Sequence, residues 1–172
     1  PRPISRHRAL IVEAGSPSDI PRTFEASVSQ ACQAVRSGLF GKKARLKRVK
    51  SLRRLSVEIP TRDTGVEKML FLTSQLLAAL QADGMTGASV IYGDVSYCQA
   101  AQNMFPSNDT VHIDAVDDAE LSSRLLVFNP TADNEDLVFE LLDDVWRGEA
   151  VVLFNPEFSD SFKEQNKAFI QA

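Results

Sequence analysis

The sequence predicts a single three-layer α/β domain whose mostly parallel sheet of about five strands is flanked by helices. The main observation is that short apolar or alternating stretches, typical of strands, alternate with amphipathic stretches long enough for helices, as in βαβ units. The length of 172 residues suits one domain with a sizeable core, and 44% hydrophobic and 24% charged residues are typical of a globular protein. Only two cysteines are present, which favours a reducing compartment over a disulfide framework.

The first helix and the first strand are each bounded by residues that break regular structure. Apolar residues three or four positions apart predict a helix over 22–38, which begins after Pro21 and ends at Gly38. Alternating apolar and polar residues predict a strand over 53–59, which Pro60 ends because proline has no N–H for the ladder.

Three further helices begin with the capping-box pattern Ser/Thr-x-x-Glu/Gln, in which the two side chains bond the backbone of the first turn. The pattern starts at Thr64, Ser96 and Ser161. We expect the first of these helices to end near Gly84, and the second to follow a short strand over 89–93.

The stretch 110–115 alternates apolar and polar residues and predicts another strand. The joint that follows, 116–123, is short for a crossover helix between parallel strands. We therefore expect this strand to lie at an edge of the sheet or to run antiparallel to its neighbour.

Two continuous apolar runs, 125–128 and 151–154, predict strands that are buried on both faces. Apolar spacing predicts a helix over 134–147 between them, closed by Gly148 as the residue after the C-cap. A helix in this position suits the crossover between two parallel neighbours.

Both buried strands end in Asn-Pro, at Asn129 and Asn155. The simpler interpretation is structural, because asparagine tolerates turns and proline ends a ladder. The alternative is that Asn129, Asn155 and Asp94 line a crevice for a small ligand at the carboxyl ends of the strands, where open α/β sheets bind ligands.

The sequence contains no motif for phosphate cradling, dinucleotide binding or a nucleophile elbow. His112 and Asp114 are expected to form a hydrogen-bonded surface pair rather than a metal site, and Cys32 and Cys98 are expected to be small core residues. We therefore expect no catalytic residue, no metal and no cofactor, and the sequence leans away from an enzyme.

Charge is divided unevenly along the chain, with a net +10 over residues 1–62 and −14 over residues 63–172. Most of the positive charge lies in one run without acids, made of Lys42, Lys43, Arg45, Lys47, Arg48, Lys50, Arg53 and Arg54. The simplest interpretation is a solvated insertion. The run also suits binding to an anionic lipid surface or to an acidic protein face. Nonspecific nucleic-acid binding is the weakest alternative, because no aromatic residue interleaves the run for base stacking.

The chain is accordingly divided into two parts. Residues 1–18 are interpreted as a basic N-terminal tail or the remnant of an organelle transit peptide, because their first residues are rich in arginine and free of acids. Residues 19–172 are expected to form the single α/β domain, with a basic insertion at 42–54.

Short motifs in a characteristic order carry a family resemblance. They are Ile20-Pro21-x-Thr23-Phe24-Glu25, Gln30-Ala31-x-x-Ala34-Val35, Val57-Glu58-Ile59-Pro60 and Leu153-Phe154-Asn155-Pro156. In this order they resemble an uncharacterised α/β domain family of plastid proteins in plants and algae, over about residues 18–158. The family includes the low-photosystem-II-accumulation proteins and a domain fused to a plastid adenylate kinase.

The resemblance implies a non-enzymatic protein of the chloroplast stroma, peripheral to the thylakoid. It implies action in photosystem assembly, or as a peripheral component, through contacts with a photosynthetic complex or another thylakoid protein. No catalytic residue is carried over, and the alternative of a ligand-binding or enzymatic crevice stays open. The family domain continues well beyond its Asn-Pro motif, whereas this chain ends at Ala172, so we expect a truncated or divergent end.

Overall fold

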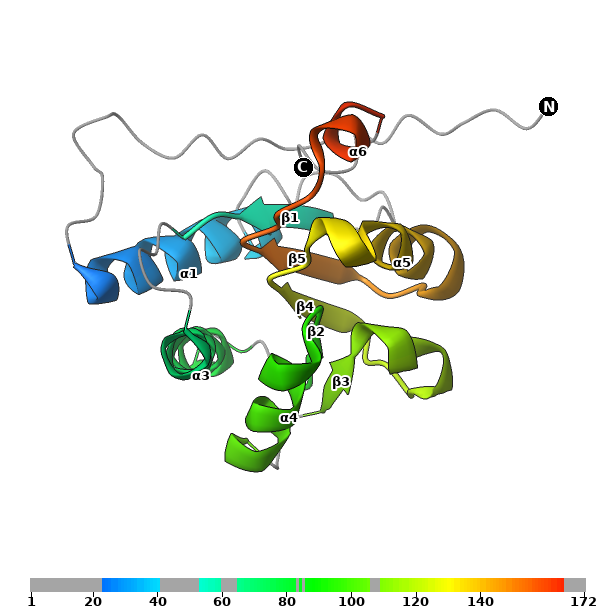
Figure 1. The fold of residues 1–172 in the computed structure, drawn as a ribbon. Coiled ribbons are helices and arrows are strands. Elements are labelled where there is room, and N and C mark those ends of the chain that lie inside the picture. The colour runs from blue at the N-terminus through cyan, green and yellow to red at the C-terminus, as the bar shows by residue number, and fades with distance from the viewer. Residues whose placement is uncertain are drawn as a thin grey trace.

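The computed structural model contains one five-stranded sheet in which every pair of neighbours is parallel, with the strand order β1-β5-β4-β2-β3 (Figure 1). The structure describes residues 23–40, 53–59, 65–82, 84, 86–105 and 109–165. The strands are β1 (Arg53–Val57), β2 (Ser89–Tyr92), β3 (Thr110–His112), β4 (Arg124–Phe128) and β5 (Ala150–Phe154). The predicted parallel α/β architecture is confirmed.

Helices cover both faces of this sheet. One face is covered by α1 (Phe24–Phe40), α3 (Val66–Ala82) and α4 (Val95–Met104). The other is covered by α5 (Glu135–Glu140), the turns around it and α6 (Asp160–Gln165). Alternate residues of each buried strand point to opposite faces of the sheet. In β4, Leu126 and Phe128 belong to the core on the side of α1 and α3, whereas Leu125 and Val127 belong to the core on the side of α5.

An aromatic row crosses the sheet at its carboxyl end. The ring of Phe128 stacks on Tyr92 with centroids 5.6 Å apart, and on Phe154 with centroids 4.7 Å apart. All three rings are almost fully buried, so this row closes the core directly beneath the loops that follow β2, β4 and β5.

The edge strand β3 is shorter than predicted and runs parallel to β2. The expectation of an edge position is correct, while the antiparallel alternative is wrong. The chain leaves the strand at His112 and forms a 3₁₀ turn over Ile113–Asp118, whose buried residues Ile113 and Val116 lie three apart, as this helix type requires.

Two helices begin two residues earlier than their capping boxes predicted. Asp94, not Ser96, caps α4, and the Ser96 hydroxyl itself donates to Asp94. At α6 the hydroxyl of Ser159 accepts from the amide of Phe162 at 3.2 Å, which displaces Ser161 from the expected role. Thr64 lies outside the described residues.

The predicted helix over 134–147 is a composite that ends early. A 3₁₀ turn (Ala132–Asn134) leads into α5, and a π turn (Leu141–Val145) ends at Trp146, whose amide donates to the carbonyl of Leu141 at 2.8 Å. The prediction that Gly148 is the residue after the C-cap is wrong, since Gly148 has no positive φ and the C-cap is Trp146. Position 148 requires glycine because a Cβ there would lie 2.0 Å from the Trp146 ring and 2.6 Å from the carbonyl oxygen of Ser123.

Replacing Gly148 with alanine is therefore expected to lower the free energy of unfolding by about 1–3 kcal/mol through overpacking. Urea denaturation measures this loss, and Trp146→Leu provides the control background because it removes the ring that the new Cβ meets. The loss should be smaller in that background. An equal loss in both backgrounds would show that the ring is not what requires glycine.

Candidate functional site

The topological switch point of the sheet lies between β2 and β4. The chain moves outward from β2 to β3 through α4, and in the opposite direction from β4 to β5 through α5. Ligands of open α/β sheets bind at such a point. The three residues of the predicted crevice follow neighbouring strands here, with Asp94 after β2, Asn129 after β4 and Asn155 after β5.

Asp94 is engaged by the helix that follows it. Its carboxylate accepts from the amide of Ser96 at 2.7 Å and from that of Tyr97 at 3.4 Å. The hydroxyl of Ser96, followed by these two amides, holds the pKa of Asp94 below its usual value of 3.8. The side chain stabilises the N-terminus of α4, which is a structural use of a residue expected to face a ligand.

Asp94→Ala is expected to lower the free energy of unfolding by about 1 kcal/mol at neutral pH. Because the pKa is depressed in the folded state, the carboxylate stabilises the fold above pH 3.8, and this contribution is lost as the pH falls through the folded-state pKa. Urea denaturation between pH 7 and pH 3 should show the wild type approaching Asp94→Ala. The control Asp94→Asn keeps a capping acceptor that does not titrate, so its difference from alanine should stay constant; a constant wild-type difference would contradict the prediction.

Asn129 and Asn155 share an unusual backbone conformation, each with a φ of 48°. The Asn155 side-chain oxygen accepts from the amide of Ile59 at 2.6 Å, which ties the end of β5 to the chain leaving β1. The corresponding oxygen of Asn129 is buried and has no hydrogen-bond partner among the residues that the structure describes. Two matching Asn-Pro dipeptides therefore differ in how their side chains are satisfied.

The sheet register explains this difference. Val57 pairs with Phe154, and Ile59, two residues further on, donates to Asn155. On the next strand, Phe128 pairs with Phe154 in the same way. The residue two positions after Phe154 is Pro156, which therefore stands to Asn129 as Ile59 stands to Asn155. Proline has no N–H, so the position that supplies a donor in one case cannot supply it in the other.

Pro156→Ala places an N–H at that position. We compare the effect of Pro156→Ala on the free energy of unfolding in two backgrounds. In the wild-type background it should be about 1 kcal/mol more favourable than in Asn129→Gly. Asn129→Gly keeps the left-handed backbone but lacks the acceptor. A double-mutant cycle of unfolding free energies measures this coupling. Equal effects in the two backgrounds would show that position 156 and the acceptor are uncoupled.

Asn134 is a buried residue that links the loops following β2 and β4, and the sequence did not lead us to expect it. Its side chain donates to the carbonyl of Gly93 at 3.0 Å and accepts from the amide of Thr131 at 2.9 Å. His112 donates to the same Gly93 carbonyl through Nε2 at 3.2 Å, because a carbonyl can only accept. The capping-box spacing from Thr131 to Asn134 was the sequence signal that could have identified this buried residue.

The remaining titratable candidates are structural where the structure describes them. His112 lies 3.5 Å from the carboxylate of Asp114, which agrees with the expected surface pair. Burial raises the pKa of the Cys98 thiol, and it raises the pKa of Tyr92 to about 12. A protonated thiol is a poor nucleophile and a poor ligand. Within the described ranges, no three His, Cys, Asp or Glu side chains are grouped to hold a metal ion.

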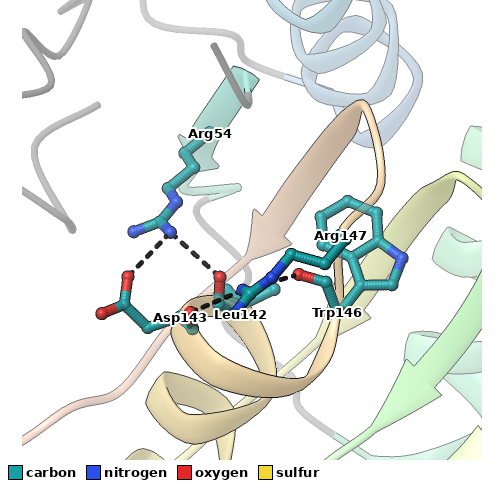
Figure 2. A network of polar contacts seen from close by, with 5 residues as sticks. All are labelled: Arg54, Leu142, Asp143, Trp146 and Arg147. Carbon is teal, nitrogen blue, oxygen red and sulfur yellow. Dashed lines mark hydrogen bonds and ion pairs between the residues drawn. The ribbon is translucent and has the colours of Figure 1, made fainter. Parts of the chain in front are cut away.

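The basic run lies mostly outside the described residues, which include only Arg53 and Arg54 of the eight. Arg54 donates to the carbonyl of Leu142 at 3.0 Å and to the carboxylate of Asp143 at 3.2 Å (Figure 2). It thus ties β1 to the π turn. Arg147 donates to the main-chain oxygen of Asp143 at 2.7 Å and braces the same turn.

A groove of about 430 Å³ between α1 and α3 is the second candidate surface. Phe24 of α1 and Phe71 of α3 stack at one end of it with centroids 5.5 Å apart, and Phe71 is 53% exposed. Of the described residues that line it, only Glu25 and Arg36 are charged. The sequence signal for Phe71 was a large apolar residue that lies off the buried stripe of its helix.

The exposed ring makes the groove the more distinctive of the two surfaces. Contiguous exposed apolar surface marks interaction sites, and here the exposed Phe71 ring is continuous with the apolar lining of the groove. Among the described helices, none combines the length and the apolar character that crossing a membrane requires.

Comparison with known proteins places the whole domain in one family. The model of a family described as "Domain of unknown function (DUF1995)" matches residues 21–171. No curated protein and no solved structure matches the chain.

Proposed function

This chain belongs to the DUF1995 family, and we propose that it is a non-catalytic chloroplast protein that acts through contacts with other proteins. Its role is in photosystem assembly, or as a peripheral component at the stromal surface of the thylakoid. The observation that carries the proposal is the groove between α1 and α3, with the half-exposed Phe71 stacked on Phe24 at one end.

The chemistry of the groove suits a protein partner. An exposed aromatic ring loses little conformational entropy on binding and supplies a large contact area, as hot-spot residues of interfaces do. The floor is apolar, with Val28 and Cys32 buried beneath the surface, and Gln33 and Gln75 provide hydrogen-bonding groups at the rim. An apolar floor with a polar rim is the usual anatomy of a protein interface.

The test is affinity purification of the tagged protein from chloroplast membranes, with mass spectrometry of what co-purifies. We expect photosystem subunits with the wild type, and their loss with Phe71→Asp. Val145→Asp is the matched control, because Val145 is also an exposed apolar residue but lies on the opposite face of the sheet. Recovery of the same subunits with Phe71→Asp would contradict the use of this groove.

The basic run adds a second contact in this proposal, with anionic thylakoid lipid. Each lysine or arginine near such a surface contributes about 1 kcal/mol. Flotation with anionic and neutral vesicles tests it with a variant neutralised over residues 42–50, which leaves Arg54 and its bond to Asp143 intact. Equal binding to both kinds of vesicle, unchanged in the variant, would exclude the lipid contact.

A second candidate function is ligand binding at the switch point, which the Asn129 oxygen favours because no group in the described part of the chain bonds it. Against it, Asp94, Asn134 and Asn155 already bond the backbone around them. A thermal-shift screen with metabolites tests this candidate. If the switch point binds a ligand, one metabolite class should raise the melting temperature of the wild type and leave that of Asn129→Gly unchanged.

A further inference from the structure

We propose that a second copy of this chain occupies the groove between α1 and α3, with the α1 helices of the two copies packed antiparallel across a two-fold axis. This inference goes beyond the proposed function, because it gives the same groove a second copy of the chain as its occupant instead of a photosystem subunit. It follows from a symmetry in the residues that α1 presents there.

Four residues of α1 line the groove at spacings of four, three and four: Glu25, Ser29, Cys32 and Arg36. These spacings place them on one stripe of the helix. The stripe is symmetric about the point between Gln30 and Ala31. Glu25 and Arg36 lie equally far from this point, and so do Ser29 and Cys32. Two antiparallel copies therefore bring Glu25 opposite the partner's Arg36, and Ser29 opposite the partner's Cys32.

The charges match in this arrangement. Each Glu25 meets the partner's Arg36, and the two-fold axis produces the pair twice. An isologous interface must be self-complementary in this sense, with opposite charges at mirrored positions. Arg36 also interacts within its own chain, and its guanidinium has five N–H donors, so it can bind the partner's carboxylate in addition to that contact.

The shapes match as well. Ser29 is small, and Cys32 is only 5% exposed in the floor of the groove, so no large side chain keeps two helices apart at the centre of the stripe. The exposed ring of Phe71 lies at the Glu25 end of the groove, through its stack on Phe24. The partner's Arg36 is thereby brought beside an aromatic face, where a guanidinium is attracted by the π-system. A different protein in this groove would require no such symmetry.

Charge reversal combined with mixing tests the arrangement by sedimentation of the full chain. We expect the wild type to dimerise. Glu25→Arg alone and Arg36→Glu alone should each weaken the dimer about tenfold or more, because each places two like-charged pairs in the interface. The double variant should restore the dimer, and an equimolar mixture of the two single variants should form a heterodimer, since every pair is then of opposite charge.

Glu140→Arg is the control, because Glu140 is exposed on α5 and belongs to the other face of the sheet. Melting curves separate folding from association, since Glu25→Arg also removes an acid from the first turn of α1 in both the single and the double variant. A wild type that is monomeric up to about 1 mM, or single variants that do not associate when mixed, would overturn the proposal. Either result leaves the purification with Phe71→Asp to decide the proposed function separately.

Discussion

Replacing Phe128 with alanine is expected to lower the free energy of unfolding by about 3–5 kcal/mol. The side chain is 1% exposed and lies between two other rings, so its removal leaves a cavity that neither neighbour can fill without leaving its own stack. A domain of this size is typically stable by about 5–15 kcal/mol, so the loss is a large fraction of the total.

Urea denaturation followed by circular dichroism measures this loss. Phe71→Ala is the matched control, because the same residue type is 53% exposed there and its removal should cost less than about 1 kcal/mol. Phe128→Leu should recover most of the stability by refilling the cavity. If Phe128→Ala and Phe71→Ala proved equally destabilising, the aromatic row would not be the centre of the core.

The position of Phe128 in a doubly covered strand could be predicted from sequence, because the run Leu125–Phe128 has no polar residue to expose. The same argument identified β5, and helix-length segments between strands implied a parallel sheet. The strand order could not be obtained in this way. It depends on the direction in which each crossover moves along the sheet. The short joint after β3 passes β2 to reach β4 through a 3₁₀ turn rather than a helix.

Local competition between similar residues explains the errors at helix ends. Asp94 precedes Ser96 by two positions, and a carboxylate is the stronger acceptor for the first-turn amides, so it takes the cap. The π turn before Trp146 depends on the fit of the indole between the carbonyl of Ser122, to which it donates at 2.8 Å, and Gly148. Such contacts between distant segments leave no periodic pattern in the sequence.

The candidate surfaces, too, could be predicted from the sequence only in part. The sequence placed Asp94, Asn129 and Asn155 at strand ends, and the structure brings them to one edge of the sheet. It could not show that two of the three already bond the backbone. The groove needs two helices that are separated by β1 in the chain, so only the fold brings Phe24 to Phe71.

The two Asn-Pro dipeptides allow the site to be tested by a matched pair of substitutions. Asn155→Gly removes the acceptor of the Ile59 amide, whereas Asn129→Gly removes an acceptor that has no partner within the described ranges. Both substitutions keep a backbone with a φ of 48°, and both add the same entropy to the unfolded chain, so these terms cancel in the comparison.

We therefore expect Asn155→Gly to be more destabilising than Asn129→Gly by about 1–3 kcal/mol, the cost of leaving a buried amide unbonded. Urea denaturation of the two variants measures the difference directly. Equal losses would show that the Ile59 bond adds nothing to stability. A larger loss for Asn129→Gly would mean that its oxygen is bonded in solution, and would remove the observation that favours a ligand at the switch point.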